Sequence, residues 1–159
     1  MKTIQASETI YTELMVPSYA NFGGKIHGGL ILSIMDKVAY VCACKYSESY
    51  VVTVSVEGVE FLAPVEVGDL LTIKASVNYV GNTTMIIGMR VESFNPITSV
   101  TTHTNSCYFT MAAKNEDGSL REVQGLHEWV AFLIILVFGV FSVIQLGWTL
   151  NSKSKSTFG

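Results

Sequence analysis

A long apolar run near the N-terminus constrains the fold of this 159-residue chain more than any other feature. Residues 27–46 contain no proline, lack the alternation of a strand and exceed the usual strand length, so they predict a helix. Apolar residues occupy nearly every side of that helix, which predicts that protein surrounds it. Asp36 stands in the middle of the run, where a buried carboxylate needs a partner or a function.

Strand patterns fill most of the chain around this helix. Residues 7–16 predict a first strand that ends before Pro17. After the helix, apolar and polar residues alternate in four more segments, at about 52–61, 71–79, 85–91 and 100–113. The alternation slips at Gly58, which predicts a β-bulge. One apolar helix and one antiparallel sheet predict an α+β domain in which a curved sheet wraps around the central helix.

Charge and cysteine content limit the possible partners and the compartment. The net charge is -3 and no basic cluster precedes the C-terminal segment, which argues against nucleic acid as a partner. Three cysteines without metal-ligand spacing indicate reduced thiols, as in a cytoplasmic domain. No apolar stretch follows Lys2, so we expect no signal peptide.

The C-terminal segment differs in composition from the rest. We expect one domain over residues 1–123 and a separate segment over 124–159. Residues 129–150 carry no charge and would span roughly 33 Å as a helix, so they are a candidate transmembrane helix. Lys153 and Lys155 follow it, and the positive-inside rule would place this C-terminal end in the cytosol and the folded domain outside. A cytoplasmic domain with a C-terminal anchor would have the opposite orientation. The alternatives are an apolar helix packed on protein and a tail that is not native to the domain.

Four sequence motifs follow one another along the chain. They are Asn21-Phe22-Gly23-Gly24-Lys25-Ile26-His27-Gly28-Gly29 with Met35-Asp36, then Val52-Thr53-Val54-Ser55-Val56-Glu57, Phe61-Leu62-Ala63-Pro64-Val65-Glu66-Val67-Gly68-Asp69, and Val80-Gly81-Asn82-Thr83-Thr84-Met85. In this order they resemble the motifs of hotdog-fold acyl-CoA thioesterases of the cytosolic, brain-type acyl-CoA hydrolase group, and the resemblance covers residues 8–123. The resemblance implies a hotdog fold and hydrolysis of acyl-CoA to a free acid and coenzyme A, without a metal or any cofactor beyond the coenzyme A of the substrate.

Three residue types in the first motif suit thioester hydrolysis. Gly28 and Gly29 would open the helix with exposed backbone N–H groups, which can polarise a thioester carbonyl. Asp36 can act as a general base on water or attack as a nucleophile. Asn21 can hold the water or the carbonyl.

The spacing of these residues predicts a site shared between two chains. Asp36 lies seven residues beyond Gly29, which is ~10 Å along one helix axis. A twofold dimer with adjacent antiparallel helices would bring Asp36 of one copy to the glycine end of the other. The resemblance implies the same arrangement, and assembly as a dimer, a dimer of dimers or a trimer of dimers.

Each of the other candidate site residues has either a role in the site or a purely structural role. His27 either contacts the substrate at the N-terminus of the helix or serves only to begin the helix. Thr53 either contributes to the site or faces solvent. The resemblance places Gly81, Thr83 and Thr84 near the nucleotide end of coenzyme A, although they are also turn residues. The residues of the first motif also have structural alternatives. Asp36 could bond to Ser33, Lys37 or a strand, Asn21 could form an Asx turn, and Gly28 and Gly29 could allow close packing.

Two other functions remain open from the sequence. A hotdog dehydratase or hydratase needs a His–acid pair, for which His27 is the one suitable histidine. A membrane-tethered acyl-CoA binding or scaffold protein without turnover is the other alternative. Asn82, where the family often has a basic residue, and the unmatched tail favour it.

Overall fold

The computed structural model describes residues 7–125, and one helix and five strands account for most of them. The strands are β1 (Thr9–Leu14), β2 (Tyr50–Phe61), β3 (Leu70–Val80), β4 (Thr84–Asn95) and β5 (Val100–Lys114). The long helix is α1 (Gly28–Ser47), and a short 3-10 helix precedes it at Pro17–Tyr19. The predicted helix over 27–46 is confirmed with its bounds shifted by one residue.

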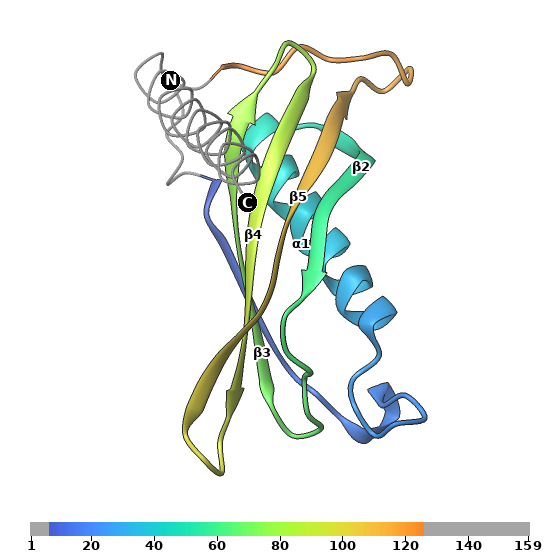
Figure 1. Cartoon of the computed structure of the whole chain (residues 1–159). Coiled ribbons are helices and arrows are strands. Elements are labelled where there is room, and N and C mark those ends of the chain that lie inside the picture. The colour runs from blue at the N-terminus through green and yellow to red at the C-terminus, as the bar shows by residue number, and fades with distance from the viewer. Residues whose placement is uncertain (1–6, 126–159) are drawn as a thin grey trace, which may run out of the picture. The chain divides into compact units, whose positions relative to one another are not determined.

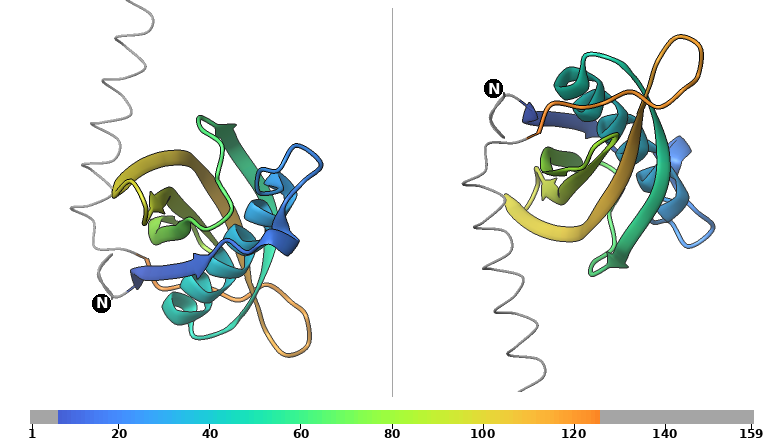
Figure 2. Two further views of the ribbon diagram at one scale, coloured as in Figure 1. Left: turned by 90° about the horizontal axis from the view of Figure 1, so that it is seen from below. Right: turned by 90° about the horizontal axis from the view of Figure 1, so that it is seen from above.

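All five strands form one antiparallel sheet in the order β1-β3-β4-β5-β2. Figure 1 shows α1 packed against this sheet, and the views of Figure 2 show the strands curving around one side of the helix. The predicted α+β fold, a curved sheet around a central helix, is therefore confirmed. Strands β1 and β2 form the two edges, because each pairs with only one neighbour.

The prediction of a bulge at Gly58 is also confirmed. The pairing of β2 with β5 shifts between Glu57 and Glu60, and Gly58 has a φ of 67°, a left-handed conformation that glycine adopts without strain. A second shift, between Thr53 and Ser55, was not apparent from the sequence.

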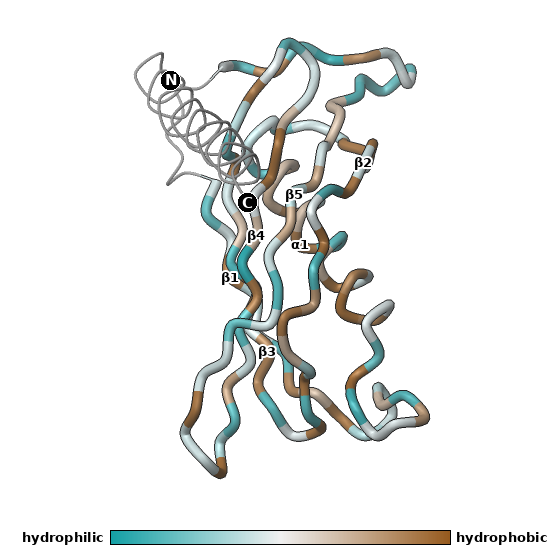
Figure 3. Tube along the Cα trace, in the orientation of Figure 1, coloured by the Kyte–Doolittle hydropathy of each residue, from teal (hydrophilic) through white to brown (hydrophobic). Residues whose placement is uncertain are grey.

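The core lies between the sheet and one face of α1. That helix face consists of residues spaced three and four apart, namely Ile31, Ile34, Met35, Val38, Ala39, Cys42, Ala43 and Tyr46. Brown, hydrophobic colouring predominates along α1 in Figure 3.

The expectation that protein surrounds α1 on all sides is wrong for the single chain. Asp36 is exposed, and Tyr40 and Val41 are about 40% and 41% exposed. The physical reason is that a single sheet covers only one side of a helix. The opposite side keeps its apolar residues but has no cover within residues 7–125.

The C-terminal prediction falls outside the described residues. Within residues 7–125, no helix is long and apolar enough to cross a membrane. The candidate helix over 129–150, and with it the separation of a C-terminal segment, remains a prediction.

Candidate active site

Asp36 and Thr53 meet on the exposed side of α1. The Thr53 hydroxyl donates to Asp36 Oδ1 at 2.6 Å, and both residues are exposed. Of the structural partners expected for the carboxylate, the structure therefore selects the neighbouring strand. Because Thr53 occupies only Oδ1, the second oxygen, Oδ2, is available to a water molecule or a substrate.

Asp36 and Thr53 belong to a seam along which α1 runs beside the edge strand β2. At one end of the seam the Phe61 ring lies against Gly28, where an added Cβ would stand 3.3 Å from the ring. At the other end the rings of Tyr40 and Tyr50 meet edge to face, with centroids 6.4 Å apart. The α1–β2 seam thus has a glycine end, a carboxylate in the middle and an aromatic end.

The N-terminus of α1 is capped by His27. His27 Nδ1 accepts a hydrogen bond from the Gly29 N–H at 3.2 Å, so the neutral ring carries its proton on Nε2. The expectation that both glycine N–H groups are free is therefore wrong for Gly29, because the cap satisfies it. The Gly28 N–H has no acceptor among residues 7–125.

Asn21 is held in a tight loop just before the helix. Its side-chain Oδ1 accepts from the N–H groups of Gly23 at 2.9 Å and Lys25 at 3.2 Å. This is the Asx-type turn considered from the sequence, but it also has a chemical consequence. With Oδ1 occupied, the side chain presents its Nδ2 as a donor, which suits a carbonyl oxygen or a water oxygen.

The second group of candidate residues lies at the other end of the domain. Gly81, Thr83 and Thr84 form the β3–β4 turn, which Figure 1 shows at the opposite end of α1 from its glycines. The Gly81 N–H donates to Thr84 O at 2.8 Å, and Thr83 O accepts from Ala113 N at 2.9 Å. A cavity of about 330 Å³ adjoins this turn, lined by Tyr79, Val80, Gly81, Asn82, Glu122, Val123 and Gly125.

A single chain therefore brings together only part of the predicted site. Thr53 is hydrogen-bonded to Asp36. The helix N-terminus carries the other group, namely Asn21, His27, Gly28 and Gly29. Seven residues of helix, ~10 Å of axial rise, separate Gly29 from Asp36. No set of three His, Cys, Asp or Glu side chains suited to a metal occurs in the described part of the chain.

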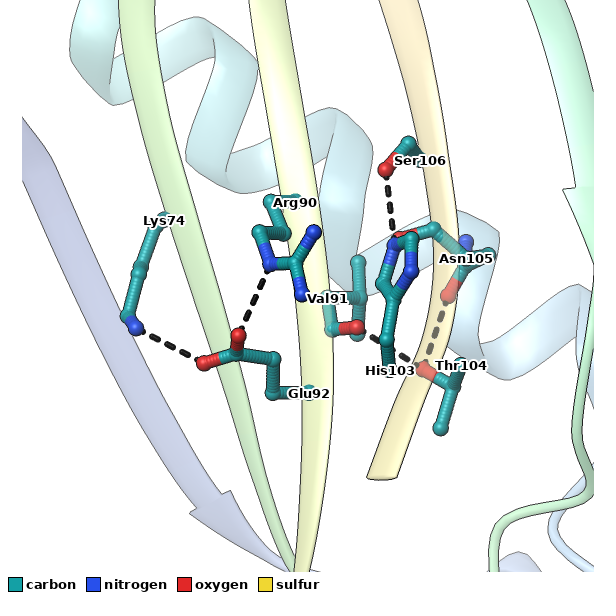
Figure 4. Close-up of polar contacts among 8 residues, drawn as sticks. All are labelled: Lys74, Arg90, Val91, Glu92, His103, Thr104, Asn105 and Ser106. Atoms are coloured by element: carbon teal, nitrogen blue, oxygen red, sulfur yellow. Dashed lines mark hydrogen bonds and ion pairs between the residues drawn. The ribbon is translucent and has the colours of Figure 1, made fainter. Parts of the chain in front are cut away.

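A separate charged cluster lies on the sheet face away from α1. Glu92 accepts from Lys74 Nζ at 2.7 Å and Arg90 Nε at 2.8 Å, as Figure 4 shows. These hydrogen bonds, with that from Lys74 the larger, lower the pKa of Glu92 to about 2. His103 on β5 bonds to Ser106 instead, so it forms no His–acid pair with any residue between 7 and 125.

Several contacts around the site were not anticipated from the sequence. They include the packing of Phe61 on Gly28, the Tyr40–Tyr50 pair, and the hydrogen bonds from Ser93 and Asn95 to the buried Asp69. Each joins residues at least ten positions apart, so no local pattern reports it. The register of β2, once known, does place Tyr50 and Phe61 at the two ends of the same edge strand.

Comparisons with known proteins agree with this fold. Residues 23–100 match the model of the thioesterase superfamily. Protein VdlD of Helicobacter pylori is 50% identical over 111 residues, which cover 70% of this chain and 64% of VdlD, slightly less than two thirds of its length. An uncharacterized acyl-CoA thioester hydrolase of Zymomonas mobilis is 31% identical over 125 residues, covering 77% of this chain and 83% of that protein.

Solved structures similar to this chain include an acyl-CoA thioesterase. The crystal structure of an apo-hexameric acyl-CoA thioesterase is 30% identical, with a TM-score of 0.78 over 99% of this chain and 98% of the other. Sequence and fold thus agree, and the chain belongs to the thioesterase superfamily.

Proposed function

We propose that this protein hydrolyses acyl-CoA thioesters to a free carboxylic acid and coenzyme A, in a site formed by two copies of the chain. The observation that carries the proposal is the exposed Asp36 carboxylate on the uncovered side of α1, with one oxygen bonded to Thr53 and the other without a partner among residues 7–125. The names of the relatives support the substrate class: the Zymomonas protein is called an acyl-CoA thioester hydrolase.

Asp36 would activate the attacking water or attack the thioester itself. Thr53 holds Oδ1, which fixes the carboxylate plane and leaves Oδ2 to accept a proton from water or to form an acyl bond. The oxyanion that follows needs N–H donors of its own, and the glycine end of a helix is suited to provide them.

The helix N-terminus and Asn21 supply such donors. The Gly28 N–H and the Asn21 Nδ2 are available, and both would donate to an oxygen that gains negative charge. Gly29 would join them only if the His27 ring turned away from its N–H. The length of that bond, 3.2 Å, lies at the long limit for N–H donors, so a charged oxygen could compete for it.

The free edge of β2 indicates how a second copy would complete the site. This strand exposes Tyr50, Val54 and Val56 and has no partner on one side within residues 7–125. An unpaired edge with apolar side chains is a surface that pairs readily with another strand. Antiparallel pairing of two β2 strands would therefore bury apolar area and satisfy the free backbone groups.

One register of that pairing would bring the two half-sites together. If two β2 strands pair about a twofold axis near Glu57, Thr53 of one copy lies across from Phe61 of the other. The Phe61 ring packs on Gly28, so the helix N-terminus of the second copy follows it toward Asp36. The related acyl-CoA thioesterase of known structure is hexameric, and a hexamer built from such dimers is consistent with the proposal.

Mixing two inactive variants tests the shared site. Asp36→Asn and Asn21→Ala are each expected to lose most activity in a thiol-release assay with a panel of acyl-CoAs. If each site takes Asp36 from one copy and Asn21 from the other, a mixed dimer contains one intact site. Subunit exchange should then restore about a quarter of wild-type activity, the statistical maximum for a twofold dimer.

The outcomes separate the possible functions. No recovery on mixing, with exchange verified by mass spectrometry, would place both residues in one chain and refute the shared site. Binding of acyl-CoA by the wild type without turnover would instead identify a binding protein. A dehydratase is less well supported, because the His27 Nδ1 is occupied by Gly29 and His27 has no carboxylate partner in the described residues.

A further inference from the structure

Asp69 is a buried carboxylate with no role in the proposed chemistry. It is 4% exposed and lies at the end of the turn that joins β2 to β3. Its Oδ2 accepts from the Ser93 hydroxyl at 2.5 Å and the Glu66 N–H at 3.3 Å, and its Oδ1 accepts from Asn95 Nδ2 at 2.9 Å. Two of these three donors, Ser93 and Asn95, lie on β4, so they fix the buried carboxylate firmly to that strand.

The turn that Asp69 fixes, residues 65–69, is here called the clamp turn. It holds both ends of the loop that carries Asn21, residues 15–27, here called the site loop. At the start of the site loop, Met15 N donates to Asp69 O at 2.9 Å and Met15 O accepts from Gly68 N at 2.7 Å. At its end, Ile26 N donates to Val65 O at 2.9 Å.

Lys25 makes the contact nearest to Asn21. Its backbone forms a bridge with Glu66, its ammonium group pairs with the Glu66 carboxylate, and its N–H donates to Asn21 Oδ1. The N–H of Glu66 in turn donates to Asp69. A continuous set of hydrogen bonds thus leads from the buried carboxylate of Asp69 through Glu66 and Lys25 to the side chain of Asn21.

We propose that Asp69 is a positioning residue, which sets the orientation of the Asn21 amide and of the α1 N-terminus through the clamp turn. The proposal rests on the thioesterase function proposed above, since it assigns Asn21 a contact with substrate. Asp69 itself lies beneath the loop and does not touch the reacting atoms. Its carboxylate matters because an amide that keeps its oxygen toward Asn95 presents an NH2 group to the Glu66 N–H, and two donors cannot bond to each other.

The test is Asp69→Asn in the full-length protein, with two readouts. The first is NMR hydrogen exchange of the Gly23 and Lys25 N–H groups, which donate to Asn21 Oδ1 and should exchange faster in the variant. The second is steady-state kinetics. We expect kcat to fall about tenfold while KM changes less than about twofold, because misplacement of a donor weakens transition-state binding more than substrate binding.

A background variant and a matched control sharpen the result. In an Asn21→Ala background, Asp69→Asn should lower kcat little further, because the group that it positions is already missing. Asp117→Asn is the control, since Asp117 also accepts from a serine hydroxyl and a backbone N–H, at 2.6 and 2.9 Å from Ser119, in a turn after β5. It should change neither exchange at Gly23 nor kcat.

Every outcome bears on the proposal. Unchanged exchange and unchanged kcat would overturn it, as would an equal loss of kcat in the presence and absence of Asn21. If Asp69→Asn does not fold, Ser93→Ala removes one donor and should show the same pattern more weakly. If the wild type has no thioesterase activity, the proposed function fails, and the exchange at Gly23 and Lys25 alone decides whether Asp69 positions the loop.

Discussion

The hydrogen bond between Thr53 and Asp36 allows a sharp test of the proposed site. Thr53→Val keeps the shape of the side chain and removes the hydroxyl that donates to Asp36 Oδ1 at 2.6 Å. A hydrogen bond to a charged group contributes ~1.5–3 kcal/mol, and 1.4 kcal/mol corresponds to a factor of ten. If the assembled site excludes water, kcat/KM should therefore fall roughly tenfold to a hundredfold.

Stability should change much less than activity. Thr53 and Asp36 are both exposed in the single chain, so water replaces the lost donor and the free energy of unfolding should fall by about 1 kcal/mol or less. The kinetic assay is thiol release from acyl-CoA, and the stability assay is urea unfolding followed by circular dichroism. The two effects together distinguish an oriented catalytic carboxylate from a structural one.

Two controls accompany this variant. Thr53→Ser retains the hydroxyl and should retain most of the activity. Thr12→Val makes the same change in an exposed threonine pair, where Thr12 and Thr72 hydroxyls lie 3.0 Å apart on strands β1 and β3, and should leave kcat/KM unchanged. Wild-type kcat/KM in Thr53→Val, in a wild-type protein that turns over, would refute the orienting role of Thr53.

Three further predictions concern charge, thiols and the C-terminal segment. The pKa of Glu92 is lowered to about 2, chiefly by the hydrogen bond from Lys74, so Glu92 stabilises the fold above about pH 4.5 and this contribution is lost as the pH falls toward 2. The difference in free energy of unfolding between wild type and Glu92→Gln, measured in urea, should therefore shrink as the pH is lowered over that range. Burial raises the pKa of Cys42 and Cys107 to about 11, so both thiols should react slowly with iodoacetamide at pH 8 and quickly after unfolding, as mass spectrometry would show. If residues 129–150 form a transmembrane helix, the full-length chain should resist carbonate extraction from membranes; release into the supernatant would contradict that prediction.

The sequence predicted the elements of this fold better than their burial. The period of the apolar residues placed the helix to within one residue and identified the bulge at Gly58. It gave the wrong environment for Asp36, which is exposed in the single chain. Periodicity shows which sides of a helix are apolar, but it does not show whether the same chain or another copy covers them.

The candidate site was predictable residue by residue but not in its connections. The carboxylate at Asp36 and the glycines at the helix start follow from local chemistry. The clamp beneath Asn21 does not, because Asp69 reads as an ordinary turn residue until Ser93 and Asn95 are seen to donate to it from β4. Those partners lie 24 and 26 residues away along the chain, and only the folded sheet brings them together.

The uncovered side of α1 connects folding with activity. The exposed aromatic rings of Tyr40, Tyr50 and Phe61 lie along the same seam as Asp36, so association that buries their apolar surface also encloses the carboxylate. Removing water from the seam would strengthen the hydrogen bond from Thr53 and the electrostatic attraction between the helix N-terminus and an oxyanion. Activity per chain should therefore fall on dilution at the concentration where the copies separate, because the apolar contacts that hold the assembly together are also the walls of the site.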